Sequence, residues 1–398
     1  MKLTLINQFF PPAQAPTGIL LYDLAVMLAQ RGHAVTVLAS AAGYGAGANG
    51  AAADPEGVRV VRLGSRGHHG NRFAGKLAEY MRFYYAARRH LFRQLAADAV
   101  VCLTTPPFIG LLGAQAWAEL GMPYVLWCMD LYPEALLAHG WLHPWNPLLS
   151  LLKRLAQKER RRAASVIALG PDMAEHLRNR GAVNVEMIPV WSNLRPDDSL
   201  DIAARQCRRE RGWADGDTIL LYSGNMGRAH SAEEFAVLAR HMQAILPRCR
   251  FVFAGDGSAR KEWERRWGDL FEFMPPVSAE QAAAHLRAAD VHLVSQRPEW
   301  TGVVVPSKFQ AACALGRPVA FAGSPHSAVG RWLAAADAGW LLPSATNEYQ
   351  SIALELMDAR LRDVKGARAL RLHRDDFSAE DNCARLADIV EKAGQGWP

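Results

Sequence analysis

The sequence lacks several features that would place it in a simple class of protein. Its six cysteines are scattered and include no C-x-x-C pair, so we expect buried, reduced thiols and neither a zinc site nor a disulfide framework. Long apolar runs are also missing. The most apolar stretch, residues 109–127, contains Glu119, Gly121 and Pro123, so we expect no transmembrane helix. The apolar start ends at Asn7, too soon for a signal peptide, and no leader is expected.

An excess of acidic residues is absent too, because the formal net charge is +6. No nucleic-acid motif accompanies this charge, so we expect no nucleic-acid partner. Basic residues concentrate in residues 66–93, interleaved with aromatics, and in residues 153–162. The first stretch has two interpretations: a basic aromatic helix over residues 72–93 that docks onto an anionic membrane surface, or a solvated face over an aromatic core stripe. For the second stretch we favour the solvated face.

The chain has 398 residues, half of them hydrophobic, enough for two domains of ordinary size. Strand and helix patterns alternate, which predicts an α/β fold with doubly wound parallel sheets. In the first half we expect strands at 3–6, 35–38, 58–63, 99–103, 124–127 and 165–169, and helices at 22–31, 72–95, 110–119 and 147–163. In the second half we expect strands at 218–222, 250–254, 291–295 and 318–322, and helices at 231–246, 307–315 and 377–392.

The alternation stops around residues 188–199, where Pro, Asn and Asp accumulate as in a linker. We therefore predict two Rossmann-like domains, residues 1–188 and 189–375, with the C-terminal helix in 376–398 packing back on the first. In open α/β sheets, ligands bind beyond the carboxyl ends of the strands. Two such sheets facing each other predict a deep inter-domain cleft lined by the loops that follow strands.

Two motifs in the chain suggest chemistry that their context does not support. Residues 45–50 fit G-x-G-x-x-G, but a loop and a strand follow them instead of a helix, so we interpret them as a surface loop. Asp215-Gly216-Asp217 resembles a metal-binding D-x-D, yet it precedes a strand, so a turn is the better interpretation. We therefore expect no metal site.

The strongest local signals lie between strands and helices of the second half. Residues 222–230 contain two glycines and Arg228, and Ser231 with Glu234 forms an S-x-x-E capping box. Pro306-Ser307-Lys308 opens a helix, and a lysine in a first turn is electrostatically unfavourable unless an anionic ligand is present. Gly255-Asp256-Gly257 is a further tight turn, and residues 274–277 follow another strand. An ordinary strand–helix turn is the alternative for residues 222–230.

Three stretches resemble family 4 glycosyltransferases, closest to the subgroup for capsule, O-antigen and colanic-acid-type polysaccharides. They are the Phe-Pro-Pro…Gly18 loop with residues 24–35, residues 222–227, and residues 306–319. The resemblance covers essentially the whole chain. It implies a GT-B fold, a nucleotide-sugar donor held mainly by the C-terminal domain, anomeric retention and no required metal. No cofactor is expected, since the nucleotide sugar is a co-substrate, with UDP preferred over GDP.

The resemblance also assigns roles to individual residues. Ser223, Gly224, Asn225, Gly227 and Arg228, with Ser307 and Lys308, would hold the diphosphate, and Gly255 belongs to the same candidate donor site. Pro276 and Val277 would meet the base, and Gly18 would lie near the phosphates and the acceptor. Asp130 would face the reacting sugar, with Arg228 and Lys308 as the other catalytic candidates.

The chain departs from the broad family at three positions. Val303 and Ala311 occupy the places of two glutamates, and Met129 that of a first-domain histidine, although the subgroup also tends to lack these residues. For Asp130 the alternative is a polar residue capping the next turn, and Glu134 is interpreted as structural.

The functional hypothesis is a retaining hexosyl- or N-acetylhexosaminyl-type transferase acting on a polyprenyl-linked acceptor for cell-surface polysaccharide. A soluble protein or small molecule is the fallback acceptor. The expected location is cytoplasmic, peripheral on the inner face of the plasma membrane. Two alternatives stay open: a nucleotide-sugar epimerase of the GT-B fold, and a catalytically silent scaffold.

Overall fold

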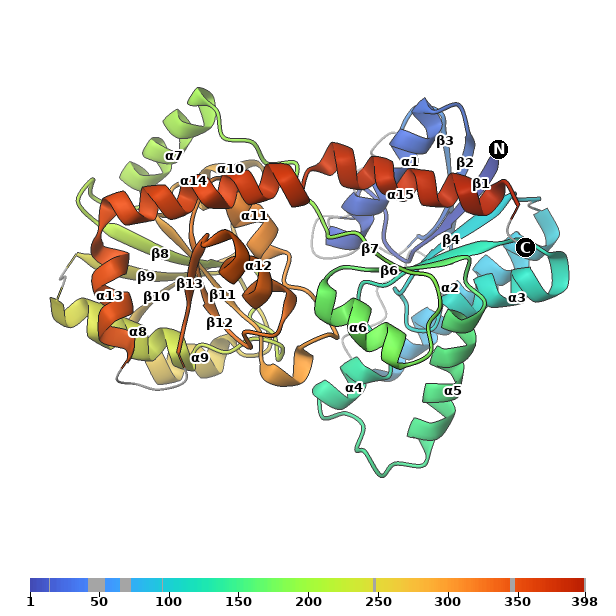
Figure 1. Cartoon of the computed structure of the whole chain (residues 1–398), viewed down its shortest axis with the longest axis horizontal. Coiled ribbons are helices and arrows are strands. Elements are labelled where there is room, and N and C mark those ends of the chain that lie inside the picture. Colours follow the sequence, from blue (N-terminus) through green and yellow to red (C-terminus); the bar gives the residue numbers. More distant parts are fainter. Residues whose placement is uncertain are drawn as a thin grey trace. The chain divides into compact units, whose positions relative to one another are not determined.

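The structure is a computed structural model that describes residues 1–13, 15–41, 54–64, 73–94, 96–245, 248–343 and 348–396 (Figure 1). The chain divides into two compact units. Unit 1 contains Met1–Pro189, Gly302–Val304 and Glu380–Pro398, and unit 2 contains Val190–Thr301 and Val305–Ala379. Within the described ranges, none of the helices combines the length and apolar character needed to cross a membrane.

Unit 1 is built on a parallel sheet with strand order β3-β2-β1-β4-β5-β6-β7. Its strands are β1 (Lys2–Ile6), β2 (Ala34–Ser40), β3 (Val58–Leu63), β4 (Ala99–Leu103), β5 (Tyr124–Trp127), β6 (Ser165–Ala168) and β7 (Val185–Met187). The central strands are buried along their length, as expected when helices cover both faces of a parallel sheet. The strand order reverses between β1 and β4, so ligands are expected beyond the carboxyl ends of these two strands.

The helices of unit 1 surround this sheet. They are α1 (Pro16–Gln30), α2 (Phe73–Gln94), α3 (Gly110–Leu120), α4 (Glu134–Ala138), α5 (Leu148–Arg161), α6 (Pro171–Asn179) and α15 (Ala379–Gly394). In Figure 1, α15 runs beside α1. Arg31, just after α1, pairs with Asp388 of α15 at 2.6 Å, and the buried face of α15 includes Leu386 and Val390. Residues from the end of the chain therefore complete the core of unit 1.

Unit 2 has a second parallel sheet, with strand order β10-β9-β8-β11-β12-β13. Its strands are β8 (Thr218–Ser223), β9 (Cys249–Ala254), β10 (Phe271–Met274), β11 (Val291–Ser295), β12 (Val319–Ala322) and β13 (Gly339–Leu341). Its helices are α7 (Asp198–Glu210), α8 (Glu233–Ile245), α9 (Arg260–Trp267), α10 (Ala279–Arg287), α11 (Lys308–Ala314), α12 (Ala328–Ala336), α13 (Tyr349–Met357) and α14 (Ala359–Asp376).

Successive side chains of the unit 2 strands pack into two different hydrophobic cores, one on each face of the sheet. On β8, Leu220 and Tyr222 belong to a core with Phe235 of α8, whereas Ile219 and Leu221 point to the other face and pack with Trp213. This period of two is the strand geometry that places helices on both faces of the sheet. The reversal point lies between β8 and β11, and it carries the candidate donor loops.

The predicted doubly wound α/β architecture is confirmed, and several boundaries need correction. Helix α1 begins at Pro16, not at residue 22, so Gly18 lies inside the helix and not in a loop. Helix α8 begins at Glu233, not at Ser231. Strand β7 lies just before the predicted linker of residues 188–199 and was not predicted, and the end of that linker already belongs to α7, which begins at Asp198. Residues 45–50, Arg66 and Arg72 lie outside the described residues.

Candidate functional site

Two glycine turns meet at the carboxyl ends of β8 and β9. Gly224 and Gly255 have φ angles of +121° and +142°, which side chains rarely adopt. A Cβ on Gly255 would lie 2.0 Å from the carbonyl oxygen of Gly224, and one on Gly257 would lie 2.4 Å from that of Met226. The two turns therefore pack backbone against backbone, which requires glycine at these positions.

The backbone of the first turn is held in place while part of it is left to bind a ligand. Met226 N–H donates to the Asp256 carbonyl at 2.8 Å, and the Tyr222 hydroxyl donates to the Asn225 carbonyl at 2.7 Å. Among the described residues, the amides of Asn225 and Gly227 donate to no protein acceptor. Such amides in a glycine turn suit the oxygens of a phosphate group.

Lys308, the first residue of α11, reaches this turn from the far side of the reversal point. Its ammonium lies 4.8 Å from the centre of the Tyr222 ring and 3.5 Å from the Asn225 carbonyl oxygen. In the part of the chain that the structure describes, no carboxylate lies within ion-pair distance of it. Burial lowers the pKa of Lys308 to about 8. A half-buried cation without a counter-ion is unfavourable unless an anion binds beside it.

His230 completes the surroundings of Lys308, and the sequence analysis gave it no role. Its Nδ1 lies 2.7 Å from the Ser295 carbonyl oxygen, which only accepts, so Nδ1 carries the proton. Its Nε2 then accepts from the Lys308 ammonium at 3.4 Å. Burial, reinforced by the charge of Lys308, lowers the pKa of His230 to about 3, so the ring is neutral. The sequence feature that could have pointed to His230 is its position in the same glycine loop as Arg228.

The other predicted donor-site residues follow strands at the same edge of the sheet. Ser223 ends β8, and the exposed Arg228 side chain extends from the loop after it. Exposed Ser307 directly precedes α11. Pro276 and Val277 follow β10, whose end is tied to the Gly255 turn by a hydrogen bond from Gly255 N–H to the Met274 carbonyl. The structure thus gathers Ser223–Gly227, Gly255 and Lys308 in direct contact, and places Arg228, Ser307, Pro276 and Val277 around them by strand order.

Two details near this loop differ from the sequence analysis. Ser231 does not cap α8 in the reciprocal manner of a capping box, because its hydroxyl donates to the carboxylate of Glu234 at 2.6 Å and its amide donates to Ser295. Asp217 is part of a turn, as predicted, and accepts from Ala214 N–H and from Arg250 at 3.0 Å.

Asp130 lies beyond the carboxyl end of β5 in unit 1. Its own amide and that of Met129 both donate to the Thr104 hydroxyl, at 3.1 and 2.8 Å, which fixes the backbone. Its carboxylate makes no hydrogen bond or ion pair with any residue that the structure describes. The capping interpretation requires such bonds and is therefore wrong. Burial raises the pKa of Asp130 to about 6.

Strands β1 and β4 of the same sheet are followed by buried polar residues and by a strained residue, for which the sequence analysis gave no role. Phe108 has a φ of +62°, a conformation uncommon for an aromatic residue and concentrated at functional sites. Asn7 and Gln8 follow β1 at the reversal point and are buried, and each keeps a side-chain oxygen without a hydrogen-bond partner. Buried polar groups at this edge of the sheet suit a polar ligand. The sequence feature that could have identified Asn7 and Gln8 is their position directly after a buried strand.

Gly18 has a packing reason of its own. It is buried in the first turn of α1, and a Cβ would lie 3.1 Å from the Phe9 carbonyl carbon. Its predicted proximity to phosphates stays a prediction.

The segment Gly302–Val304 belongs to unit 1 through backbone contacts. Leu131 N–H donates to the Val303 carbonyl at 3.1 Å, and Gly302 N–H donates to the buried Asp172 carboxylate at 2.9 Å. Val303 itself is buried, so it contributes packing and a carbonyl where the broad family has a carboxylate.

Glu134, the first residue of α4, connects this helix to α5 and α6. Its carboxylate lies 3.2 Å from His176 of α6 and 3.6 Å from Arg160 of α5. Burial alone would raise the pKa of Glu134, but the His176 hydrogen bond and the Arg160 charge outweigh burial and lower it to about 2. These contacts agree with the structural role expected for this residue.

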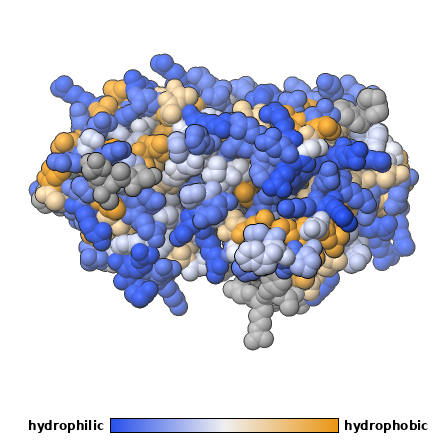
Figure 2. All heavy atoms as spheres, turned by 60° about the horizontal axis from the view of Figure 1, so that its bottom comes forward, coloured by the Kyte–Doolittle hydropathy of each residue, from blue (hydrophilic) through white to orange (hydrophobic). Residues whose placement is uncertain are grey.

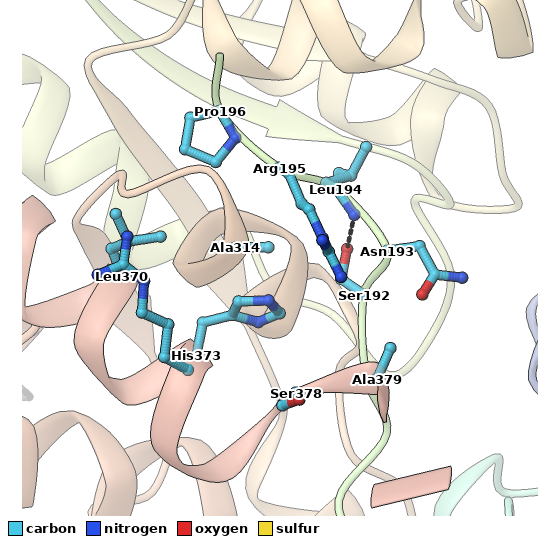
Figure 3. Close-up of a pocket in the computed structure, with 11 residues that line it drawn as sticks. Ser192, Asn193, Leu194, Arg195, Pro196, Ala314, Leu370, His373, Ser378 and Ala379 are labelled. Carbon is cyan, nitrogen blue, oxygen red and sulfur yellow. Dashed lines mark hydrogen bonds between the residues drawn. The ribbon is translucent and has the colours of Figure 1, made fainter. Parts of the chain in front are cut away.

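Unit 2 also contains a cavity of about 340 Å³ away from the predicted site residues (Figure 3). Segment 192–196 and the end of α14 line it, and the His373 ring points toward the Arg195 side chain. None of the predicted donor-site residues lines this cavity.

Comparisons with known proteins assign both halves of the chain. Residues 18–191 match the model of the glycosyl transferase 4-like domain, and residues 217–361 match that of glycosyl transferases group 1. The chain is 28% identical over 153 residues to the putative colanic acid biosynthesis glycosyl transferase WcaI of Escherichia coli K12. That match covers 38% of this chain and 38% of the relative's length, less than two thirds of it.

Solved structures share the fold over nearly the whole chain. Sucrose-phosphate synthase from Thermosynechococcus elongatus has a TM-score of 0.74 at 15% identity, with 98% of each chain covered. HepE of Anabaena, solved in complex with UDP-glucose, has a TM-score of 0.67 at 15% identity and covers 98% of this chain and 100% of its own. These similarities establish the GT-B architecture of two Rossmann-like halves.

Proposed function

The chain belongs to the group 1 glycosyl transferases, with a glycosyl transferase 4-like N-terminal domain, and from this premise we propose a retaining, metal-independent sugar transfer. The donor is a UDP-hexose or UDP-N-acetylhexosamine. The acceptor is a polyprenyl-linked saccharide used in cell-surface polysaccharide synthesis, and the site of action is the cytoplasmic face of the plasma membrane. The relation to a colanic acid transferase and the UDP-glucose complex of HepE support these choices.

The arrangement around Lys308 is the observation that carries the proposal. A half-buried ammonium without a carboxylate partner faces a glycine turn that leaves two amides free to donate. A diphosphate satisfies both, because its negative charge pairs with Lys308 and its oxygens accept from the amides of Asn225 and Gly227. Arg228, on the same loop, adds a second cation near the phosphates.

In the proposed reaction the bond between the anomeric carbon and the β-phosphate oxygen breaks while the acceptor hydroxyl oxygen bonds to the same face of that carbon. The hydroxyl proton passes to the leaving phosphate oxygen, giving UDP and the glycoside. Negative charge grows on the leaving oxygen, so preorganised cations there stabilise the transition state more than the ground state. Neutral His230 fixes the direction of the Lys308 ammonium. Asp130 orients the acceptor or stabilises positive charge on the sugar ring.

Contact with the membrane is part of the proposal. Helix α2 carries exposed Lys76 and Arg82 close to exposed Leu77, Met81 and Tyr85, which supports docking of this helix on anionic lipid. The acceptor lipid would then be delivered at the membrane surface.

Thermal shift and calorimetry with UDP, GDP and their sugar conjugates test the donor assignment. We expect stabilisation by the UDP series alone, unchanged by magnesium. Lys308→Ala should abolish this stabilisation and lower turnover by about 10²–10³-fold, as for loss of one charge-stabilising donor. Lys261→Ala, which removes an exposed cation of α9, is the matched control and should change neither. Near wild-type turnover of Lys308→Ala would exclude the assignment.

A further inference from the structure

An ordered turn between α4 and α5 in unit 1 leaves two tryptophans largely exposed, with their rings stacked on His139 and His143. Leu142 is buried, and Trp141 N–H and Leu142 N–H both donate to the Leu136 carbonyl, which anchors the turn to the end of α4. Asn146 N–H donates to the His143 carbonyl at 3.0 Å and closes the turn. Nevertheless Trp141 is 58% exposed and Trp145 is 83% exposed. The backbone order shows that this exposure is built into the fold.

The exposed apolar surface continues along α5. Leu149 and Ala156 face the core of unit 1, whereas Leu148 and Leu151 are 48% and 52% exposed. Leu148 and Leu151 are three residues apart and lie on one side of the helix. An ordinary solvated helix has polar residues at such positions, and Leu148 and Leu151 lie before residues 153–162, to which the solvated-face interpretation applies.

The charges next to these side chains have one sign. Arg154 and Lys158 follow Leu151 by three and seven residues and lie along the same side of the helix. The exposed basic residues of this segment are Lys153, Arg154, Lys158, Arg161 and Arg162. Between residues 139 and 162 the sequence has one acidic residue, Glu159, which is buried, and burial raises its pKa to about 8. The solvent-facing side therefore carries cations without acids.

We infer that these residues, which we term the Trp–Leu ridge (Trp141, Trp145, Leu148, Leu151, Arg154 and Lys158), form a membrane-docking surface that inserts into the interface of an anionic bilayer. Figure 2, with the lower side of Figure 1 turned forward, shows hydrophobic side chains gathered over the part of unit 1 with α4 and α5, beside hydrophilic ones. The chemistry of this interface suits such a surface. Tryptophan lies at the headgroup level, leucine lies below it, and basic residues pair with anionic headgroups.

Charge complementarity favours lipid over a second copy of the chain. In a two-fold symmetric contact the ridge would meet itself, which would bring its cations against identical cations without an acid to pair with them. An anionic bilayer offers apolar depth for the tryptophans and leucines together with negative charge for Arg154 and Lys158.

This inference deepens the proposed function and rests on it, because the proposed polyprenyl-linked acceptor is itself held in a bilayer. It assigns a second contact surface besides α2. A ridge on the acceptor-side unit would hold that unit against the membrane that supplies the acceptor.

Cosedimentation with vesicles tests the ridge. The wild-type chain should bind vesicles of phosphatidylcholine with phosphatidylglycerol more tightly than phosphatidylcholine alone. Trp141→Ser/Trp145→Ser should lower the partition coefficient at least about tenfold. Arg154→Gln/Lys158→Gln should lower it by about 30-fold on the anionic vesicles only. The control Ile202→Ser, at an exposed apolar residue of α7 in unit 2, should leave partitioning unchanged.

A site-specific probe reports insertion directly. All six native cysteines are buried, so Trp145→Cys offers an accessible thiol for an environment-sensitive fluorophore. Its emission should shift to the blue on anionic vesicles, whereas the same label at Ile202→Cys should not respond. Unchanged emission at position 145 on vesicles that bind the protein would overturn the inference.

Other outcomes also decide the matter. Unchanged vesicle binding of the tryptophan variant, with loss of self-association in sedimentation velocity, would assign the ridge to a second copy and overturn the inference. Binding lost only in Leu77→Ser/Met81→Ser would assign the membrane contact to α2 alone. UDP stabilisation of the same samples is measured in parallel. Retained UDP binding without vesicle binding rejects the ridge, and vesicle binding without UDP binding rejects the donor assignment.

Discussion

At the scale of single residues, the pKa of Lys308 links the proposed donor site to pH. Burial lowers this pKa to about 8, so the ligand-free chain loses the charge as pH rises through this value. A bound diphosphate favours the charged form and raises the pKa. UDP affinity should therefore be constant between about pH 7 and 8, where the terminal phosphate of UDP is ionised, and weaken above pH 8, by up to about tenfold per pH unit. Calorimetric titrations across this range measure the effect.

Lys308→Arg is the control for this pH dependence. Arginine keeps its charge throughout the range, so the variant should bind UDP with an affinity that does not fall above pH 8, although its planar guanidinium changes the geometry. The same alkaline weakening in Lys308→Arg would assign the titration to another group.

Asp130 provides a second test at this scale. Asp130→Asn should reduce sugar transfer by about 100-fold or more while leaving UDP affinity within about twofold. Burial raises the pKa of Asp130 to about 6, so the carboxylate becomes protonated and the wild-type rate should fall as pH drops through 6. The rate of the variant should not show this fall at acidic pH. Glu119→Gln, an exposed acid of α3, is the control. A variant with full transfer activity would remove Asp130 from the mechanism.

Site residues could be predicted when a short stretch of sequence was enough to reveal them. Lys308 and the glycines were predicted because a cation in a first turn and paired glycines are unusual in any short window. His230 was missed because its role depends on Ser295 and Lys308, which come from distant parts of the chain. The isolation of the Asp130 carboxylate likewise depends on which groups the fold keeps away from it.

At the scale of elements, the two glycine turns position the loop that we propose to bind phosphate. Gly255→Ala places a Cβ 2.0 Å from the Gly224 carbonyl oxygen, so the turns must separate. We expect a loss of at least about 2 kcal/mol in the free energy of unfolding, together with loss of UDP binding. Gly212→Ala, also at positive φ but with nothing within 4 Å of a Cβ, should cost about 1 kcal/mol and preserve binding. Equal effects of both substitutions in denaturant unfolding would contradict the packed-turn account.

Element positions were predicted better than element ends. Strand 58–63 and strand 291–295 have the predicted bounds, because their apolar runs stop at turn residues. Helix α1 begins six residues earlier than predicted, since Pro16 and Gly18 were taken as loop residues although proline is well placed in a first turn and Gly18 packs on Phe9. The exposure of Leu148 and Leu151 on α5 was not predicted, because sequence alone does not show which leucines face the core.

At the scale of the whole molecule, strand–helix alternation was sufficient to predict the architecture. Each sheet is parallel with its reversal point beside the first strand of its unit, as in doubly wound folds. The participation of Gly302–Val304 in unit 1 was not predictable from the sequence. It rests on a hydrogen bond from the Leu131 amide to the Val303 carbonyl and on one from the Gly302 amide to the Asp172 carboxylate, and neither leaves a pattern in the sequence. The family assignment rests on motifs in order along the chain, which matching models of both halves confirm.

Thermal unfolding of Lys308→Met with and without UDP tests the central claim most directly. The folded state lowers the pKa of Lys308, so the unfolded chain binds this proton more tightly, and the unpaired charge costs stability at every pH below about 8. The account predicts that the ligand-free variant unfolds at a higher temperature than the wild type and that UDP no longer stabilises it. A ligand-free variant that unfolds at a lower temperature, or one that UDP still stabilises fully, would contradict the claim that Lys308 is held without a counter-ion to bind the donor diphosphate.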